Sequence, residues 1–353
     1  MSNRILIIIA IILVNLGCTN KKTDRLKESE LPIEYSNKKS GLGEIDLNMI
    51  GSIGSDTDEK YMFSIISDMA VDKNGNLFVL DKGFQNLRIF NNNGIYIKEH
   101  KIRNGQGPGE FVNISSIDIS DDDDEILCYD SAVFMVTCLS KDDFSYKRSI
   151  RIKPQFSDIY GYYDKSVTTV TYSYGVKKET KLIYNYDKNG NEINRYGSFQ
   201  DGVEELVMKD IQNAIPPYST QKDSFIYISF SYPYDIRIYN NNTKKLMKRF
   251  AKKTDYYGGI VQRGEFKFPG GSSCGIVAVD DSLILNFIEN KKDNEIYIHA
   301  FDYNGLGRGV INMTDYKLYP IQSSAVSFNN KIYLFSAEHY PCPMIETFLI
   351  ERK

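Results

Sequence analysis

The sequence contains no tryptophan, only three histidines and no excess of basic over acidic residues. Its 43 Lys and Arg residues and 46 Asp and Glu residues give a formal net charge of −3 at pH 7. A nucleic-acid-binding domain usually concentrates positive charge against phosphates, so this balance indicates no nucleic-acid partner. The histidines, His100, His299 and His339, lie far apart in the chain and lack the spacing of metal ligands.

Long apolar runs are scarce as well. The run at residues 5–14 is too short to span a bilayer but is typical of the apolar region of a signal peptide, and no later run is long enough to cross a membrane. It follows Arg4 and ends near Gly17-Cys18, which resembles a lipobox, where a cysteine is acylated and becomes the new N-terminus. We therefore expect residues 1–18 to be a lipoprotein signal peptide with Cys18 as the lipidation site. An ordinary signal peptide with a chance cysteine is the alternative.

Residues 19–42 are polar, lysine-rich and without periodicity, so we expect a flexible tether between the membrane and a domain at residues 43–353. Export would place this domain in an oxidising compartment. Four cysteines follow the lipobox, and an even number permits two disulfides: Cys128, Cys138, Cys274 and Cys342.

Tyrosine and phenylalanine are abundant, at 26 and 19 residues, which favours strands. Short apolar runs alternate with turns rich in Asn, Asp and Gly, as at residues 66–100, and this four-strand unit recurs along the chain. The turns between the first two strands of each unit begin near residues 72, 121, 163, 221, 279 and 328. Six such units predict an all-β fold, a six-bladed β-propeller with four-stranded antiparallel blades.

The sixth unit lacks its outer strand, because the sequence stops at Lys353. A strand pattern at residues 44–53 precedes the first unit and has no partner there. We expect this N-terminal strand to join the last blade, which closes the ring and removes a free sheet edge.

The link between the first two units reads Gly-Gln-Gly-Pro-Gly-Glu-Phe at residues 105–111. This link and the turn pair at residues 72–94 resemble the six-bladed propeller lipoproteins of Bacteroidota, which are relatives in shape of NHL-repeat and TolB-like propellers. The resemblance covers most of the mature chain and is most specific in the first two blades. It implies the fold, export and lipidation, and thus a cell-envelope location on the periplasmic or outer-membrane surface. It carries over no catalytic residues. The sequence has no P-loop, and its Gly-rich run at residues 305–309 lacks the spacing of a dinucleotide site, so we expect no cofactor.

In such propellers one face usually binds ligands. It carries the loops between second and third strands and the connections between blades. The candidate ligand-binding residues expected on this face are Lys82, Gln85, Arg103, Gln106, Glu110, Tyr172, Tyr174, Tyr232, Tyr234, Arg263, His339 and Tyr340. Residues 103–111 have a second interpretation, a rigid strap with Phe111 wedged between blades and Glu110 capping backbone amides. The loop tyrosines also have a second interpretation: a chain with 26 tyrosines places some in every loop without a binding role.

Metal and catalytic motifs are weak. Residues 72–76 and 187–191 match the start of a calcium loop but lack its later Gly and Glu, so they predict hairpin turns. Residues 121–124 indicate a solvated acidic turn, with a surface calcium as the alternative. Residues 271–275 match Gly-x-Ser-x-Gly, but a strand pattern follows where a nucleophile elbow needs a helix. We expect no metal ligands.

Cys128 and Cys138 occupy neighbouring strands of the second unit. If Asp81 pairs with Leu87 in the first unit, the equivalent register places Cys128 opposite Cys138, close enough for a disulfide. Two buried free thiols are the alternative.

These observations favour a non-enzymatic cell-envelope protein that binds a glycan, a peptide or an envelope protein through one propeller face, with membrane contact through its lipid anchor. The alternative is a propeller-type hydrolase such as a lactonase, or a lyase, which usually holds a metal on its inner strands. The positions that begin inner strands carry mainly hydroxyls, which disfavours this alternative: Asn113, Ser115, Ser116, Ser323 and Ser324. A structural scaffold within an envelope complex is a third interpretation.

Overall fold

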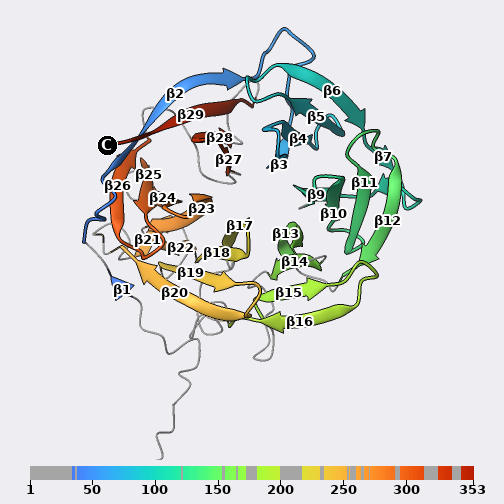
Figure 1. Ribbon diagram of the computed structural model, residues 1–353. Coiled ribbons are helices and arrows are strands. Elements are labelled where there is room, and N and C mark those ends of the chain that lie inside the picture. Colours follow the sequence, from blue (N-terminus) through green and yellow to red (C-terminus); the bar gives the residue numbers. More distant parts are fainter. Residues whose placement is uncertain are drawn as a thin grey trace, which may run out of the picture.

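The computed structural model describes residues 34–35, 38–120, 122–152, 156–163, 166–171, 181–198, 217–230, 234–252, 254, 260–263, 266–269, 271–290, 295–313, 325–335 and 343–353. These residues form strands and turns arranged as a ring of six sheets (Figure 1). The predicted six-bladed propeller with four-stranded antiparallel blades is confirmed. Over these ranges no helix is long and apolar enough to cross a membrane.

The first three blades follow the chain from the inner to the outer strand. Blade 1 contains β3 (Ile66–Val71), β4 (Leu77–Asp81), β5 (Asn86–Phe90) and β6 (Tyr96–Lys101). Blade 2 contains β9 (Ile114–Ile119), β10 (Glu125–Asp130), β11 (Met135–Ser140) and β12 (Tyr146–Arg151). Blade 3 contains β13 (Phe156–Tyr163), β14 (Ser166–Thr171), β15 (Ile183–Tyr186) and β16 (Glu192–Tyr196).

The last three blades complete the ring. Blade 4 contains β17 (Tyr218–Lys222), β18 (Phe225–Phe230), β19 (Asp235–Asn240) and β20 (Lys245–Ala251), with β1 (Glu34–Tyr35) added outside β20. Blade 5 contains β23 (Gly271–Asp280), β24 (Leu283–Asn290), β25 (Glu295–Phe301) and β26 (Gly307–Asn312). Blade 6 contains β27 (Ala325–Phe328), β28 (Lys331–Phe335), β29 (Ile345–Arg352) and, outermost, β2 (Ile45–Ile53).

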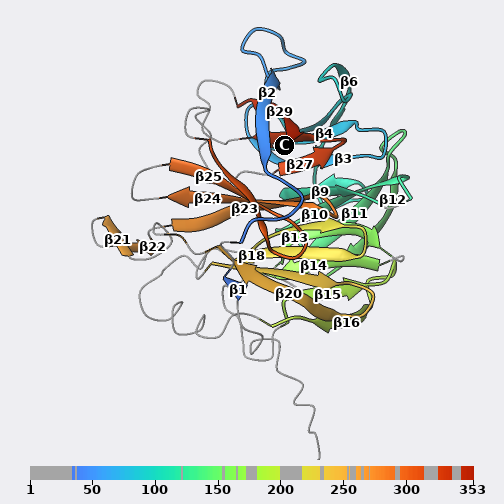
Figure 2. The same cartoon turned by 60° about the vertical axis from the view of Figure 1, so that its left-hand side comes forward.

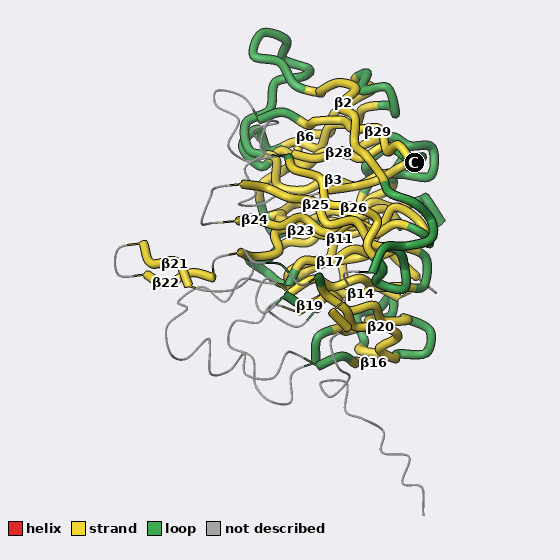
Figure 3. Tube along the Cα trace, turned by 90° about the vertical axis from the view of Figure 1, so that its left-hand side faces the viewer, coloured by secondary structure: helices red, strands yellow, loops and turns green. Residues whose placement is uncertain are grey.

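Two short strand pairs lie in connections between blades. The pair β7 (Arg103–Asn104) and β8 (Glu110–Phe111) links blades 1 and 2, and the hairpin of β21 (Ile260–Arg263) and β22 (Phe266–Pro269) links blades 4 and 5. The chain reverses at each step within a blade. The first-to-second and third-to-fourth turns therefore share one face of the ring, the turn face. The second-to-third loops and the blade connections share the other, the loop face. Figure 3 shows β21 and β22 projecting on one side of the ring.

The core lies between blades rather than within any one of them. Alternate side chains of β4 enter two different apolar clusters: Leu77 and Val79 pack against blade 6, whereas Phe78 and Leu80 pack against blade 2. A strand buried on both faces needs apolar residues at successive positions, which explains the unbroken run Leu77–Leu80. Each of the six blade junctions has such a cluster.

The ring closes through β2, as the sequence predicts. β2 pairs antiparallel with β29 from Ile45 opposite Arg352 to Ile53 opposite Ile345. Each inner strand contacts the inner strands of both neighbouring blades, so β3 of blade 1 meets β27 of blade 6. Leu47 of β2 is buried in the cluster between blades 5 and 6. Closure therefore rests on backbone pairing and on apolar burial together.

The end of the segment expected to be a tether lies against the propeller. β1 pairs in parallel with β20, and the Ser40 hydroxyl donates a hydrogen bond to Asp302 (2.6 Å), which directly follows β25. The buried Arg308 guanidinium donates to the carbonyl oxygens of Leu42 and Gly43, both at 3.1 Å. The chain before β2 thus runs across the outer strands of blades 5 and 4 (Figure 2). The segment from Cys18 to residue 33 lies outside the described residues.

Turns that begin with Asp or Asn repeat on the turn face. In the first, Asp72 Oδ1 accepts hydrogen bonds from the backbone amides of Asn74 (2.9 Å) and Asn76 (2.8 Å). Asp187 makes the equivalent pair in blade 3, which confirms both as hairpin turns. The turns that begin at Asp72, Asn91, Asp187 and Asp302 contain a glycine at positive φ that lies close to the preceding blade. A Cβ on Gly305 (φ +79°) would lie 2.6 Å from Cγ of Phe250.

The expected register between the two cysteines of blade 2 is wrong. Cys128 lies opposite Thr137, and Cys138 lies opposite Leu127. The two cysteines therefore point to opposite faces of the blade, Cys128 towards blade 1 and Cys138 towards blade 3. Both thiols are free and buried, as is that of Cys274, and burial raises the pKa of Cys128. Cys342 lies outside the described residues.

Candidate functional site: the loop surface of blades 1 and 2

A buried carboxylate organises the loop face of blade 1. Asp81, at the end of β4, accepts hydrogen bonds from two amides of the incoming blade connection, Ser64 (2.9 Å) and Ile65 (3.1 Å). It also accepts from two amides of its own second-to-third loop, Gly83 (3.0 Å) and Phe84 (3.1 Å). One side chain therefore fixes two separate backbone segments side by side.

Asp130 repeats this arrangement in blade 2. It accepts from the amides of Val112 (2.6 Å) and Asn113 (3.2 Å) in the connection from blade 1, and from Ala132 (3.0 Å) in its own loop. The fourth residue of both loops has positive φ, at 52° for Gln85 and 55° for Phe134. The two loops are thus built to the same plan, and each holds the connection that precedes it.

The strap of residues 103–111 joins these two loops. β7 and β8 pair in parallel, and Glu110 accepts a hydrogen bond from the amide of Gly107 (3.0 Å). Phe111 is 2% exposed and lies in the apolar cluster between blades 1 and 2. Asn104 donates to the Gln85 side chain (3.1 Å), which ties the strap to the loop of blade 1. The rigid-strap interpretation of Phe111 and Glu110 is therefore confirmed.

Three apolar side chains stand exposed on this fixed backbone. Ile65 is 58% exposed, Phe84 45% and Val112 49%. Polar residues from the same loops and strap are also exposed; they are Lys82, Gln85, Arg103 and Gln106. We call these seven residues the blade 1–2 loop surface. The sequence prediction included its four polar members and missed the three apolar ones.

Tyr234, another predicted ligand-binding residue, does not lie on this surface. Tyr234 is only 4% exposed, because its hydroxyl is hydrogen-bonded to Nδ1 of His299 (3.0 Å) in the junction between blades 4 and 5. Burial, with a smaller contribution from Lys252, lowers the pKa of His299 to about 3, so this imidazole is neutral. The remaining predicted residues lie outside the described side chains; they are Tyr172, Tyr174, Tyr232, Arg263, His339 and Tyr340.

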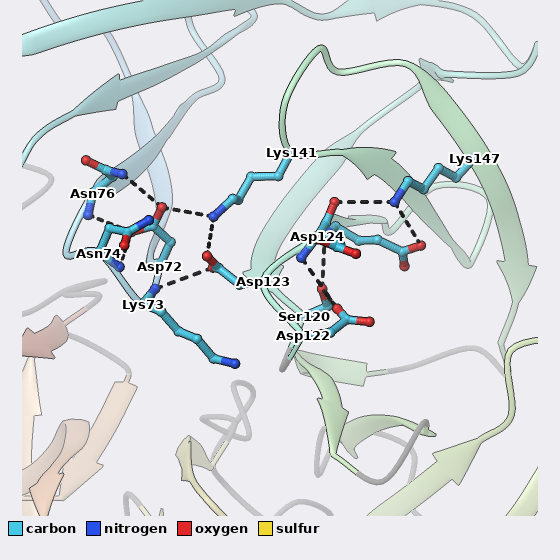
Figure 4. Close-up of polar contacts among 11 residues, drawn as sticks. Asp72, Lys73, Asn74, Asn76, Ser120, Asp122, Asp123, Asp124, Lys141 and Lys147 are labelled. Carbon is cyan, nitrogen blue, oxygen red and sulfur yellow. Dashed lines mark hydrogen bonds and ion pairs between the residues drawn. The ribbon is translucent and has the colours of Figure 1, made fainter.

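The acidic turn of blade 2 takes part in an ion-pair network on the turn face (Figure 4). Lys141 lies between Asp72 of blade 1 (3.1 Å) and Asp123 of blade 2, with which it makes a closer contact. Burial lowers the pKa of Lys141, but the two carboxylates outweigh it and the pKa is raised overall. The network joins the turns of two blades. No group of three or more His, Cys, Asp or Glu residues is placed to hold a metal ion within the described part of the chain.

The ring of six four-stranded blades defines a six-bladed β-propeller. The chain belongs to the DUF5128 family, described as a 6-bladed beta-propeller, whose sequence profile matches residues 45–258. The resemblance to Bacteroidota propellers is thereby confirmed for the family and the fold. A search of the curated proteins found no match.

Several solved structures have a similar fold. A Bacteroides fragilis protein described as exported has a TM-score of 0.60 at 13% identity, with 91% of this chain and 98% of that chain covered. A member of the DUF4221 family from Bacteroides vulgatus has a TM-score of 0.62 at 11% identity, covering 88% and 100%. The PQQ-bound aldose sugar dehydrogenase of Streptomyces coelicolor has a TM-score of 0.54 at 10% identity, covering 88% and 99%. At these identities the similarity shows the fold alone.

Proposed function

We propose that this protein is an exported, lipid-anchored binding protein of the cell envelope, and that it holds a peptide or protein segment on the blade 1–2 loop surface. The observation that carries the proposal is the exposure of Ile65, Phe84 and Val112 on backbone that buried carboxylates fix in place. Exposed apolar groups rimmed by polar ones are typical of interaction sites. The signal-peptide pattern before Cys18 supports the location, as does the similar B. fragilis protein described as exported.

The geometry suits a peptide because the surface is pre-organised. Asp81 and Asp130 already order both loops, so binding would cost little further conformational entropy. The Arg88 guanidinium lies 5.3 Å from the Phe84 ring centroid, which supports the ring while leaving it partly exposed. Gln85 and Gln106 could exchange hydrogen bonds with a peptide backbone, and Lys82 and Arg103 favour acidic side chains next to apolar ones.

The test is peptide selection with residues 19–353, using a displayed random-peptide library, alongside a glycan array with the same protein. We expect selected peptides to combine apolar and acidic residues. The triple variant Ile65→Ser, Phe84→Ser and Val112→Ser should bind them at least about tenfold more weakly, since truncating a hot-spot side chain costs about 2 kcal/mol or more and one of the three would suffice. The matched control, Ile97→Ser with Ile193→Ser, removes exposed isoleucines from outer strands and should bind normally.

An equal loss of peptide binding in the triple variant and the control would overturn the proposal. Binding to glycans on the array without selection of any peptide would also overturn it. The melting temperature of each variant shows whether a loss reflects unfolding instead. The substituted side chains are exposed, so both variants should melt close to the parent protein.

A further inference from the structure

A run of basic residues lies away from the loop surface. Residues 236–254 contain seven basic residues and no acidic one, although the whole chain has a net charge of −3. Three of the seven lie on β20, the outer strand of blade 4: Lys245, Lys248 and Arg249. Arg237 and Arg249 both pair with the buried Asp235 at 2.9 Å. Their charges are therefore partly neutralised inside the blade, and the surface charge comes from the lysines.

The outward part of β20 combines charge with an exposed apolar group. Lys245 is exposed and Lys248 is half-buried, and neither has a carboxylate partner in the described ranges. Met247, between them, is 45% exposed. We call Lys245, Met247 and Lys248 the blade 4 flank. Basic residues around a protruding apolar side chain are typical of surfaces that lie on anionic lipid headgroups.

The N-terminal segment leads to this same flank. Glu34 pairs with Phe250 and Tyr35 with Ala251, so the chain joins the ring at the end of β20. Cys18 precedes Glu34 by 16 positions. Sixteen residues span at most about 55 Å when extended, and roughly 22 Å as a flexible coil. The intervening sequence carries four basic residues, Lys21, Lys22, Arg25 and Lys27, against three acidic ones, Asp24, Glu28 and Glu30.

We propose that the blade 4 flank docks on the anionic headgroups of the membrane that carries the lipid anchor, so that the propeller lies on its side. This proposal rests on the lipidation in the proposed function. Blade 4 lies across the ring from blade 1 (Figure 1). Side-on docking therefore holds the blade 1–2 loop surface at the greatest distance from the bilayer, where a partner can reach it. The anchor supplies stable attachment, and the flank supplies orientation.

The test measures vesicle binding with residues 19–353, which lack the acyl groups, so that the flank acts alone. Phosphatidylcholine vesicles are compared with vesicles that also contain phosphatidylglycerol. We expect flotation only with the anionic vesicles, and its loss at raised salt because charges are screened. Each lysine removed should lower the partition about fivefold. The double variant Lys245→Gln with Lys248→Gln should therefore bind about 25-fold more weakly. Lys101→Gln with Lys188→Gln removes two exposed lysines from other blades, so it should bind normally.

Three outcomes would overturn the proposal. The first is equal flotation with both vesicle types, and the second is equal loss in both double variants. The third is binding to a soluble polyanion, such as polyglutamate, without binding to anionic vesicles, which would assign the flank to another partner. The Phe84→Ser variant should float normally, and the flank variant should bind selected peptides normally. Failure of the docking proposal is thus distinguishable from failure of the peptide-binding proposal.

Discussion

Replacing Asp81 with alanine should destabilise the propeller and loosen its loop surface together. The substitution removes the acceptor of four backbone hydrogen bonds and the carboxylate 3.7 Å from the buried Arg88 guanidinium. Removing one partner of a buried ion pair typically costs about 3–5 kcal/mol, against a total stability of about 5–15 kcal/mol. For a domain of roughly 300 residues, an unfolding entropy of about 2.1 cal/mol/K per residue converts this cost into a Tm decrease of about 5–8 °C.

The assay combines calorimetry with hydrogen–deuterium exchange. The amides of Ser64, Ile65, Gly83 and Phe84 should exchange faster in the variant, whereas the ladders of blades 3 and 4 should be unchanged. Asp56→Ala removes an exposed carboxylate from the same connection and serves as the control, with a Tm close to that of the parent protein. A Tm decrease below about 2 °C would refute the reasoning, and so would normal protection of all four amides.

Three further predictions concern the core. The unfolded state takes up a proton at His299 below about pH 6.5 and the folded state does not. The protein should therefore lose about 1.4 kcal/mol of stability through this residue as the pH falls from about 7.5 to about 5.5. The Tm of His299→Gln should depend less on pH, and parallel Tm profiles of the variant and the parent protein would contradict this. Gly305→Ala should cost about 1–3 kcal/mol through its positive φ and its contact with the preceding blade, whereas Gly51→Ala, with open space around its Cβ, should be mild; equal midpoints in urea would contradict it. Cys128 and Cys138 should react with iodoacetamide only after unfolding, as mapped by mass spectrometry, and rapid labelling of the native protein would show that they are not buried thiols.

The features that sequence reasoning predicted are those encoded locally. The turn beginning at Asp72 has its own hydrogen-bonding side chain and its own glycine, so its type can be inferred from five residues. Repetition of such turns marks the blades. The strand at β2 was predictable because an apolar pattern without a neighbour needs a partner, and the last unit lacked one.

The features that sequence reasoning missed depend on contacts between segments that are distant in the chain. The cysteine register differed by one residue because the second-to-third loops contain four residues, with Asp81 opposite Asn86 rather than Leu87. A shift of one residue moves a side chain to the other face of the sheet, which separates Cys128 from Cys138. Tyr234 is buried because a histidine from the next blade meets its hydroxyl. The exposure of Phe84 likewise depends on how the blades meet.

The shared sheet of blade 6 has a consequence for how the chain matures. Ile45 and Arg352 pair although about 300 residues separate them, and closing a loop of that length costs about 5 kcal/mol in chain entropy. Five blades can form before β2 pairs with β29, and until then Leu47 and Ile53 of β2 lack their packing partners in blade 6. Because β29 must find β2, which lies about 300 residues away in the chain, we expect ring closure to be a slow folding step that leaves an unpaired sheet edge exposed until it is complete. A chaperone that shields this edge would therefore limit aggregation more than one that acts on any other blade.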